Sequence, residues 1–455
     1  MISFKANFFK MNKGPKCQPA YFSTVRNNVM KKLSLSSGEG LLIKTGNNVF
    51  PTVLRKHGSN RVSYGFTVPH KIANNLQKNP EFILLSKNIR KISYINKKNH
   101  LNLLKIIPPK TIRKFNMYKF NYENNKILFW IFSKGNKPYA LPKFVPLRKN
   151  EFSLLEVFGA FNCEGAKYRK KNRHRDKLSF SNAEIEQINW FMISLKKLLD
   201  IDEKEWKLQI FYPKIDEQNK KRLLVHWEQL GIAIENISFI RNNRISAPYG
   251  IGILNIFNST LSEVFYYLMK YCKKIACNSR ANAIDVFRGF SRGDMGVIEN
   301  TITFDDEERS NLILFRNVCN KLGIETGSIK FNPGKKGWWN IRITHRENFK
   351  KILRFDGIKH SERKERIIKD FLNNRKLSIY KYLKSISNGF GDSVSLSKRL
   401  NLSVITTRFY LSKLRKEGYL NIKKLGNHNK ILYKLTKGGK KEFAFYKNLE
   451  KQLVK

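Results

Sequence analysis

The chain has 455 residues, which is enough for two to four domains, and its hydrophobic content of 41% excludes a disordered protein. The 88 lysines and arginines outnumber the 35 acids and give a net charge of +53, so we expect a polyanionic partner, with nucleic acid as the first candidate. No stretch approaches the roughly 20 apolar residues of a membrane span, so we expect no membrane partner.

The cysteines and histidines give no sign of a metal centre. The five cysteines include no Cys-x-x-Cys pair, and the eight histidines are scattered along the chain. We therefore expect no zinc site and an intracellular, reducing setting. We take that setting as cytoplasmic, with an organelle as the alternative.

The N-terminal third is predicted to be a basic tail followed by a β-rich domain. Residues 1–37 are basic and irregular, so we expect a flexible tail, with an organelle-targeting peptide as the alternative. Residues 38–147 alternate short apolar runs with Gly and Asn turns, which is typical of strands. Leu101–Ile107 belongs to this strand pattern. The lysines of the domain favour contact with DNA over a role in packing alone.

Two stretches of the central region are alike. They are LLEVFGAFNCEG at 154–165 and AIDVFRGFSRGDMG at 283–296. When the two are superimposed, Gly159 matches Gly289 and Glu164 matches Asp294. Each stretch is followed by an alternating strand and an amphipathic helix. The repeat indicates two related regions, the first at 148–277 and the second at 278–373.

The apolar character of both stretches predicts buried helices that end in an acid. Small residues let two helices approach closely, so we expect contact through Gly159, Ala160 and Gly289, with Glu164 and Asp294 brought side by side. Adjacent carboxylates repel each other unless a cation bridges them, and oxygen ligands suit Mg²⁺ or another divalent cation. Such a site can activate water against a phosphodiester. Taken singly, each stretch is also typical of a core helix ended by a glycine.

The two stretches resemble the paired motifs of a single-chain LAGLIDADG homing endonuclease. Val157–Gly165 matches the nine-residue motif at its central glycine, its acid and its final glycine. Phe287–Met295 departs from the motif at its last position, and Gly296 is the candidate for that glycine one position later. The resemblance covers about 150–372. It implies an α+β fold of two pseudo-symmetric αββαββα repeats in a monomer, because one chain carries both halves.

The resemblance also implies which residues contact DNA, because in this family the strands after each motif form a saddle in the major groove. The candidates are Arg169, Arg173, Arg175 and Lys177 in the first repeat and Lys335, Lys336 and Arg342 in the second. A flexible loop that contacts only phosphate is the alternative for the first set. In the family a basic residue near the acids assists catalysis, and Lys359 is the candidate here.

Residues 374–455 predict three helices, a two-stranded hairpin and a last helix capped by Thr436. This order resembles a winged helix-turn-helix DNA-binding domain, in which the third helix enters the major groove. The implied contacts are Ser403, Thr406, Thr407, Arg408, Tyr410 and, in the wing, Lys430. Roughly 20 basic residues against four acids fit contact with phosphate, and a winged helix that binds protein is the alternative.

The sequence is therefore interpreted as a site-specific endonuclease that cuts double-stranded DNA by metal-dependent hydrolysis. Two alternatives use the same scaffold. One is a non-catalytic DNA-binding transcriptional regulator, and the other is an RNA maturase for intron splicing, for which the partner is RNA. The departure at Met295 favours the regulator, whereas retention of Glu164 and Asp294 favours the nuclease.

Overall fold

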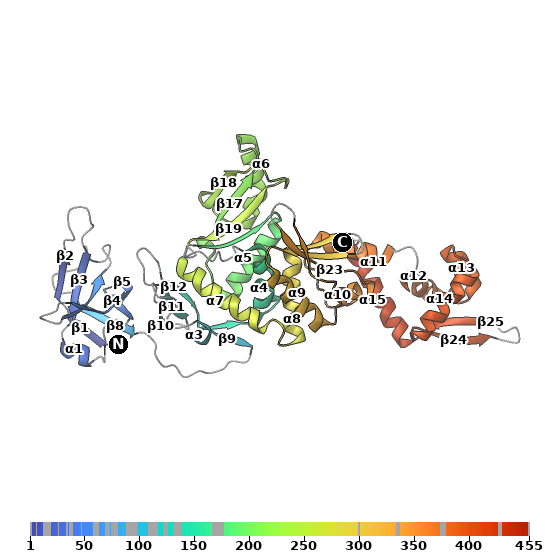
Figure 1. Cartoon of the computed structure of the whole chain (residues 1–455), viewed down its shortest axis with the longest axis horizontal. Helices are drawn as coiled ribbons and strands as arrows, with labels where there is room; N and C mark the ends of the chain where they lie inside the picture. The colour runs from blue at the N-terminus through green and yellow to red at the C-terminus, as the bar shows by residue number, and fades with distance from the viewer. Residues whose placement is uncertain are drawn as a thin grey trace. The chain divides into compact units, whose positions relative to one another are not determined.

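The chain is a mixed α and β protein in a computed structural model (Figure 1). The structure describes residues 2–5, 7–11, 20–25, 27–32, 35, 40–46, 48–57, 63–68, 73, 81–87, 99–107, 117–121, 126–131, 138–165, 177–298, 301–333, 337–373, 379–425 and 430–453. The chain forms two compact units, Met1–Ala276 and Cys277–Lys455. Within these described ranges, no helix has the length and apolar character needed to cross a membrane.

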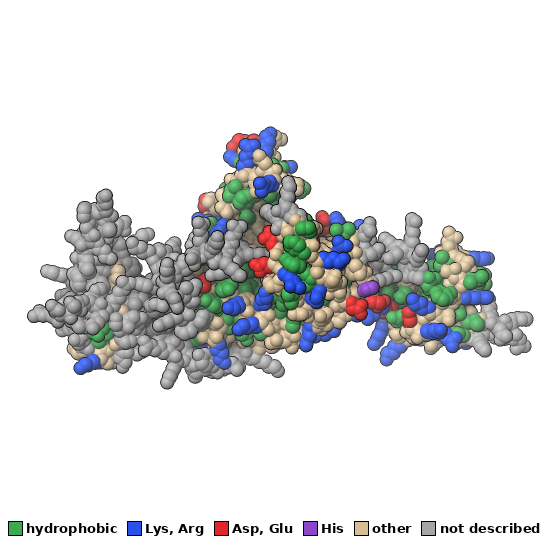
Figure 2. All heavy atoms as spheres, in the orientation of Figure 1, with side chains coloured by type: hydrophobic (Ala, Val, Ile, Leu, Met, Phe, Trp, Pro, Cys, Tyr) green, Lys and Arg blue, Asp and Glu red, His purple; other side chains and the backbone are tan. Residues whose placement is uncertain are grey.

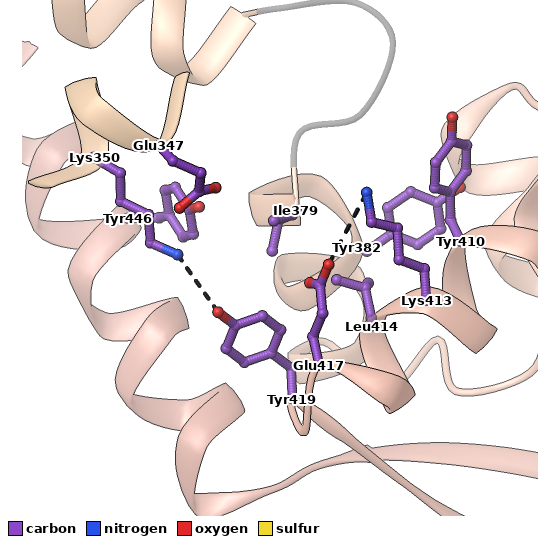
Figure 3. Close-up of a pocket in the computed structure, with 10 residues that line it drawn as sticks. All are labelled: Glu347, Lys350, Ile379, Tyr382, Tyr410, Lys413, Leu414, Glu417, Tyr419 and Tyr446. Atoms are coloured by element: carbon purple, nitrogen blue, oxygen red, sulfur yellow. Dashed lines mark hydrogen bonds and ion pairs between the residues drawn. The ribbon is translucent and has the colours of Figure 1, made fainter. Parts of the chain in front are cut away.

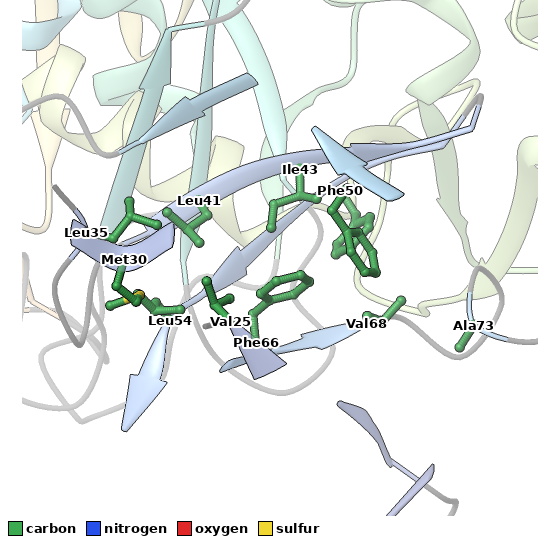
Figure 4. Packing of buried hydrophobic residues seen from close by; sticks show 11 residues of the cluster. Val25, Met30, Leu35, Leu41, Ile43, Phe50, Leu54, Phe66, Val68 and Ala73 are labelled. Carbon is green, nitrogen blue, oxygen red and sulfur yellow. The ribbon is translucent and has the colours of Figure 1, made fainter. Parts of the chain in front are cut away.

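Two four-stranded sheets begin the first unit, in the orders β1-β8-β4-β5 and β2-β3-β7-β6. Their elements are β1 (Ile2–Lys5), β2 (Asn7–Met11), β3 (Ala20–Val25), α1 (Asn27–Lys32), β4 (Gly40–Thr45), β5 (Asn48–Val53), β6 (Arg55–His57), β7 (Ser63–Val68) and β8 (Glu81–Lys87). One hydrophobic core takes residues from both sheets (Figure 4). At its centre the Phe66 ring of β7 lies 5.1 Å from the Phe82 ring of β8. The two sheets therefore share a buried face.

The expectation of a flexible tail at 1–37 is wrong, because β1, β2, β3 and α1 all lie there. Strand β1 pairs with β8, with Ile2 opposite Leu84, and β3 pairs with β7. These partners lie far along the chain. The local pattern of apolar and polar residues in this basic segment therefore did not indicate that its strands pair with β7 and β8.

Shorter strands connect these sheets to the central region. They are β9 (His100–Asn102), β10 (Met117–Asn121), β11 (Lys126–Ile131), β12 (Tyr139–Pro142), β13 (Phe144–Pro146), β14 (Arg148–Lys149) and β15 (Phe152–Ser153). The predicted strand at Leu101–Ile107 is only partly correct, because β9 gives way to helix α3 (Leu103–Ile106). The Asn102 side chain accepts a hydrogen bond from the Leu104 amide at 3.0 Å and caps that helix.

The rest of the first unit is a sheet with helices packed on it. Its elements are α4 (Leu154–Glu164), β16 (Leu178–Asn182), α5 (Ile185–Leu199), η1 (Glu203–Glu205), β17 (Lys207–Tyr212), α6 (Glu217–Trp227), η2 (Glu228–Leu230), η3 (Ile234–Asn236), β18 (Ile237–Arg241), β19 (Ile251–Ile256) and α7 (Ser259–Ile275). The sheet order is β16-β19-β17-β18. Phe180 of β16 stacks on Phe191 of α5, and Phe161 of α4 lies edge-on to Phe265 of α7. These rings hold α4 in a hydrophobic core.

The second unit begins with the order α8-β20-β21-α9-β22-β23-α10, which is the element order expected for one repeat. The elements are α8 (Arg280–Arg292), β20 (Met295–Ile298), β21 (Thr301–Asp306), α9 (Arg309–Leu322), β22 (Lys330–Asn332), β23 (Trp338–Ile343), α10 (Arg346–Arg354) and α11 (Ser361–Asn373). The antiparallel sheet has the order β20-β21-β23-β22. Phe290 of α8 and Phe304 of β21 meet Phe315 of α9 in its core.

The C-terminal elements follow the order predicted from the sequence. They are α12 (Ile379–Ser387), α13 (Ser393–Leu400), α14 (Val404–Lys416), β24 (Leu420–Leu425), β25 (Lys430–Leu435) and α15 (Lys437–Leu453). The Thr436 hydroxyl accepts a hydrogen bond from the Gly439 amide at 2.9 Å, which confirms the predicted cap. Helix α15 packs against α11 and α12 and so joins this region to the rest of the second unit.

Candidate nucleic-acid interface

Helix α4 places Glu164 beside β16, at the edge of the β16-β19-β17-β18 sheet. Ser153 caps the start of the helix, and nearly all of its residues are buried. Glu164 is its last residue and is partly exposed. The main-chain oxygen of Glu164 accepts a hydrogen bond from the Ser181 hydroxyl at 3.1 Å, and its carboxylate accepts one from the Asn182 amide at 3.4 Å. A side chain at Gly165 would collide with the Phe161 carbonyl, so the close turn into the sheet requires glycine.

Asp294 occupies a different local position from Glu164. Helix α8 ends at Arg292, and Asp294 lies in the turn between this helix and β20. The expectation that both acids end their helices is therefore correct for Glu164 and wrong for Asp294. Gly296 lies inside β20 opposite Thr303, where a Cβ would come within 2.7 Å of the threonine hydroxyl. The close approach to Thr303 explains why a glycine stands at position 296, which is not at the end of α8.

Arg363 of α11 holds the turn that carries Asp294. Its guanidinium donates hydrogen bonds to the carbonyls of Ser291 at 3.1 Å and Gly293 at 2.5 Å. A cation at this position also complements the partial negative charge at the end of α8. Arg363 was not among the residues predicted from the sequence, because a bond that reaches some 70 residues back leaves no local pattern.

Lys359 lies near the same turn, but its ammonium group has a partner. Its amide donates to the Ser291 hydroxyl at 2.9 Å, whereas its side chain pairs with Asp356. Lys364 pairs with the other carboxylate oxygen of Asp356 at 2.8 Å. Burial acts to raise the pKa of Asp356, but hydrogen bonds from both lysines hold that pKa below its usual range. Lys359 therefore lies near Asp294 in the fold as an ion-paired group.

The carboxylates fit a cation that takes few protein ligands. Among the described residues, no three His, Cys, Asp or Glu side chains gather as a metal cluster. Glu164 belongs to the first unit and Asp294 to the second, and each is one partly exposed carboxylate beside a sheet. Mg²⁺ commonly takes one or two carboxylates and completes its shell with water and phosphate oxygens. The donor chemistry of Glu164 and Asp294 suits such a role.

The predicted packing of the two glycine-centred helices remains a prediction. Gly159, Ala160 and Gly289 are all buried. Within its own unit, α4 packs against α5 and α7, and α8 packs against α9.

One face of the β20-β21-β23-β22 sheet of the second unit is exposed and polar. In β23, Ile341 and Ile343 face the core, whereas Arg342 is exposed on the opposite face. Arg342 lies opposite Thr303 and donates to the side chain of Asn340, which in turn bonds Asp305. Arginine and asparagine are the side chains that most often read base edges in a major groove. This face therefore has the chemistry expected of a DNA-reading sheet.

The β16-β19-β17-β18 sheet carries a polar row too, but two of its members, Ser179 and Asn255, are buried. Ser179 of β16 donates to Asn255 of β19 at 2.6 Å, and Asn255 donates to Gln209 of β17 at 3.2 Å. Lys177 precedes β16, and its ammonium group lies 5.4 Å from the Phe257 ring. The other saddle candidates lie outside the described residues, and they are Arg169, Arg173, Arg175, Lys335 and Lys336. On the face drawn in Figure 2, the Lys and Arg side chains of the described residues are scattered among hydrophobic and other side chains.

Helix α14 and its cap carry most of the residues predicted to contact DNA in the C-terminal region. Ser403 caps the helix by accepting from the Thr406 amide at 3.0 Å, and its hydroxyl lies 2.7 Å from that of Thr406. Arg408 is exposed and reaches the Ser393 hydroxyl at 3.4 Å. Thr407 is fully buried, so its prediction as a DNA contact is wrong. It lies on the face of α14 that also carries the buried Leu411.

Tyr410 faces a cavity and not the outer face of the helix. The cavity has a volume of about 320 Å³, and Figure 3 shows side chains of α10 and α15 on one side of it and of α14 on the other. The Tyr410 ring lies 6.0 Å from that of Tyr382. Lys430 begins β25 opposite Leu425, which places its backbone in the hairpin predicted as the wing.

Comparisons with known proteins give weak structural likenesses. No protein-family profile and no curated protein sequence matches the chain. A chain from a study of mesophilic variants of the homing endonuclease I-DmoI aligns with a TM-score of 0.29 at 13% identity, over 44% of this chain and 91% of that one. I-DmoI in complex with DNA and Mn aligns with a TM-score of 0.28 at 14% identity, over 44% and 92%. Full-length DUF199/WhiA from Thermatoga maritima aligns with a TM-score of 0.27 at 12% identity, over 58% and 91%.

Proposed function

We propose that the chain is a site-specific endonuclease that hydrolyses double-stranded DNA, with Glu164 and Asp294 as ligands to a divalent cation. One observation carries the proposal. In each unit a buried, glycine-containing helix leads directly to an acid, and that acid adjoins a sheet with a polar face. A net charge of +53 supports DNA as the partner.

The residues of the chain supply position and charge for this reaction. A bound divalent cation would activate water and stabilise charge on the phosphodiester. Asn182 holds the carboxylate of Glu164, and Arg363 holds the backbone of the turn that carries Asp294. The Arg363 guanidinium also supplies a positive charge near the turn of Asp294. The exposed polar face of the β20-β21-β23-β22 sheet, which carries Arg342, would hold the duplex while each strand is cut.

A second candidate is a DNA-binding regulator that does not cleave. The observation that favours it is the asymmetry of the two acids, because Glu164 ends a helix and Asp294 lies in the turn after one. A divalent cation that requires the two carboxylates at equivalent positions of the two repeats would bind less tightly to Glu164 and Asp294. Binding without cleavage is the outcome that this candidate predicts.

The decisive experiment is a cleavage selection with the full chain. Purified protein is incubated with a randomised duplex pool in Mg²⁺ and, separately, in Ca²⁺, and both cut ends and bound fragments are sequenced. We expect discrete cut ends in Mg²⁺ for the wild type and none for the Glu164→Gln, Asp294→Asn double variant. Each single variant should nick or fail to cut, because it keeps the shape of the side chain but removes a ligand charge.

Glu235→Gln is the matched control, because Glu235 is an exposed acid remote in sequence from both motifs, and it should cut like the wild type. Equal cleavage by the wild type and the double variant would overturn the assignment of the acids. Specific bound fragments without cut ends would establish the regulator. Selective binding of structured RNA in place of any duplex would establish the maturase.

A further inference from the structure

Helix α14 carries large apolar side chains on its outward face. Ile405 is 82% exposed and Phe409 is 64% exposed, and they lie one helical turn apart. The inward face of the same helix is already packed, because Thr407, Leu411 and Leu414 are buried on it. Ile405 and Phe409 are therefore not required for the packing of this region. Exposed apolar side chains that lie side by side form a patch, and contiguous patches, in contrast to scattered single residues, mark binding surfaces.

The charge around this pair identifies the kind of partner. Residues 393–416, which form α13 and α14, contain six lysines and arginines and no acid. Arg408 lies between Ile405 and Phe409 in the sequence and is exposed with them. A second copy of the chain would bring like charges together at this surface, which disfavours self-association. A polyanion with apolar groups on its surface is complementary to both features.

Duplex DNA has one such apolar group, the C5 methyl of thymine in the major groove. One helical turn separates Ile405 and Phe409 by about 6 Å along the axis, which corresponds to roughly two base-pair steps of 3.4 Å. We propose that α14 enters the major groove and that Ile405 and Phe409 pack against thymine methyl groups about two steps apart. Arg408 and the other cations of α13 and α14 contact the flanking phosphates.

This inference rests on the proposed function, because it requires that the chain binds duplex DNA. It adds the base that the C-terminal region reads and the two side chains that read it. Removal of a buried methyl group weakens binding by about fourfold, so two methyl groups correspond to roughly 10- to 20-fold.

The test replaces thymine by deoxyuridine, which removes only the methyl group and leaves every hydrogen bond of the base pair. The duplex recovered from the selection is prepared with thymine or with deoxyuridine throughout, and binding of the full chain is measured in Ca²⁺. We expect the wild type to bind the thymine duplex roughly 10-fold more tightly or better. The Ile405→Ala, Phe409→Ala double variant should bind the two duplexes almost equally.

Val225→Ala is the matched control, because Val225 of α6 is 62% exposed, and it should keep the wild-type preference. Both changes are on exposed side chains, so the thermal unfolding of each variant should match that of the wild type. Equal binding of both duplexes by the wild type, or an unchanged preference in the double variant, would overturn the inference while the proposed function stands. A wild-type dimer that the double variant dissociates would also overturn it, because a second copy would then cover this face. Failure of the wild type to bind any duplex would remove the proposed function itself.

Discussion

Asp356 pairs with two lysines close to the turn that carries Asp294. Its carboxylate pairs with Lys359 and Lys364, and the Lys359 amide donates to Ser291 at the end of α8. The Asp356 backbone has a φ of +52°, a conformation that asparagine also adopts readily. The Asp356 carboxylate therefore links Lys359 to Lys364 of α11, and Arg288 of α8 separately donates to the Asp356 carbonyl at 3.1 Å.

The Asp356→Asn variant tests this link, because it keeps the backbone and removes the charge. We expect the free energy of unfolding at pH 7 to fall by about 0.5–1 kcal/mol, since the paired side chains are partly exposed. The folded pKa of Asp356 lies below its ordinary value of 3.8, so this stability is present above pH 3.8 and is lost as the pH falls through the folded pKa. Urea unfolding should show a smaller difference between variant and wild type at pH 3 than at pH 7. An equal difference at both values would mean that the ion pairs are not its source.

At the scale of elements, one buried acid fixes α15 to α10. Glu442 is 4% exposed and lies 2.6 Å from Lys350 and 2.6 Å from Arg354. The Lys350 side chain is itself 8% exposed, so loss of Glu442 would leave a buried ammonium group with no counter-charge and only its hydrogen bond to the Tyr419 hydroxyl. We expect Glu442→Gln to lower the free energy of unfolding by about 3–5 kcal/mol, because breaking a buried pair is far more costly than breaking a surface pair.

Glu450 on the same helix provides the control for this prediction. It pairs with Lys384 at 2.9 Å, but both side chains are at least 40% exposed, so Glu450→Gln should change stability by no more than about 1 kcal/mol. Thermal unfolding of both variants would measure the contrast. Similar losses for the two variants would show that Glu442 does not stabilise the docking of α15 beyond a surface ion pair.

The contrast between predicted and observed elements follows from the range of the interactions that form them. The amphipathic helix predicted after the first motif is present as α5, because its apolar period is a local property. A cap is harder to predict: Asn258, Ser259 and Thr260 are all capping residue types, and the structure shows that the Asn258 side chain accepts from the Leu261 amide. β1 and Arg363 were missed for a common reason. Their partners lie dozens of residues away in sequence.

The same limit applies to the candidate site. Glu164 and Asp294 were identified from a repeated pattern, whereas burial of Thr407 depends on which face of α14 packs inward. That face could have been inferred from the spacing of Leu411 and Leu414, because both lie on it. The outward positions, Ile405 among them, would then have been recognised as candidates for contact.

At the scale of the whole molecule, the excess of basic residues sets how binding responds to salt. The 88 lysines and arginines against 35 acids occur in all parts of the chain, and Lys and Arg side chains are widely spread on the described surface (Figure 2). A broad basic surface binds any polyanion at low ionic strength, because each phosphate contact releases counterions. Binding at low salt therefore cannot separate a DNA partner, as the endonuclease requires, from an RNA partner, as a maturase requires.

We expect affinity for a non-cognate duplex to fall by about 10³- to 10⁵-fold between 50 and 200 mM salt, as for a protein that makes six to ten phosphate contacts. The duplex recovered by selection should keep measurable binding at 200 mM, because contacts to base edges release no counterions and persist when phosphate contacts weaken. Titrations at several salt concentrations, with a structured RNA of equal length as competitor, would measure both effects. If only the RNA remains bound at 200 mM, the endonuclease proposal fails and a role in RNA folding takes its place. If the duplex remains bound and the RNA is released, the specific contacts of the sheet faces and α14 are directed at DNA.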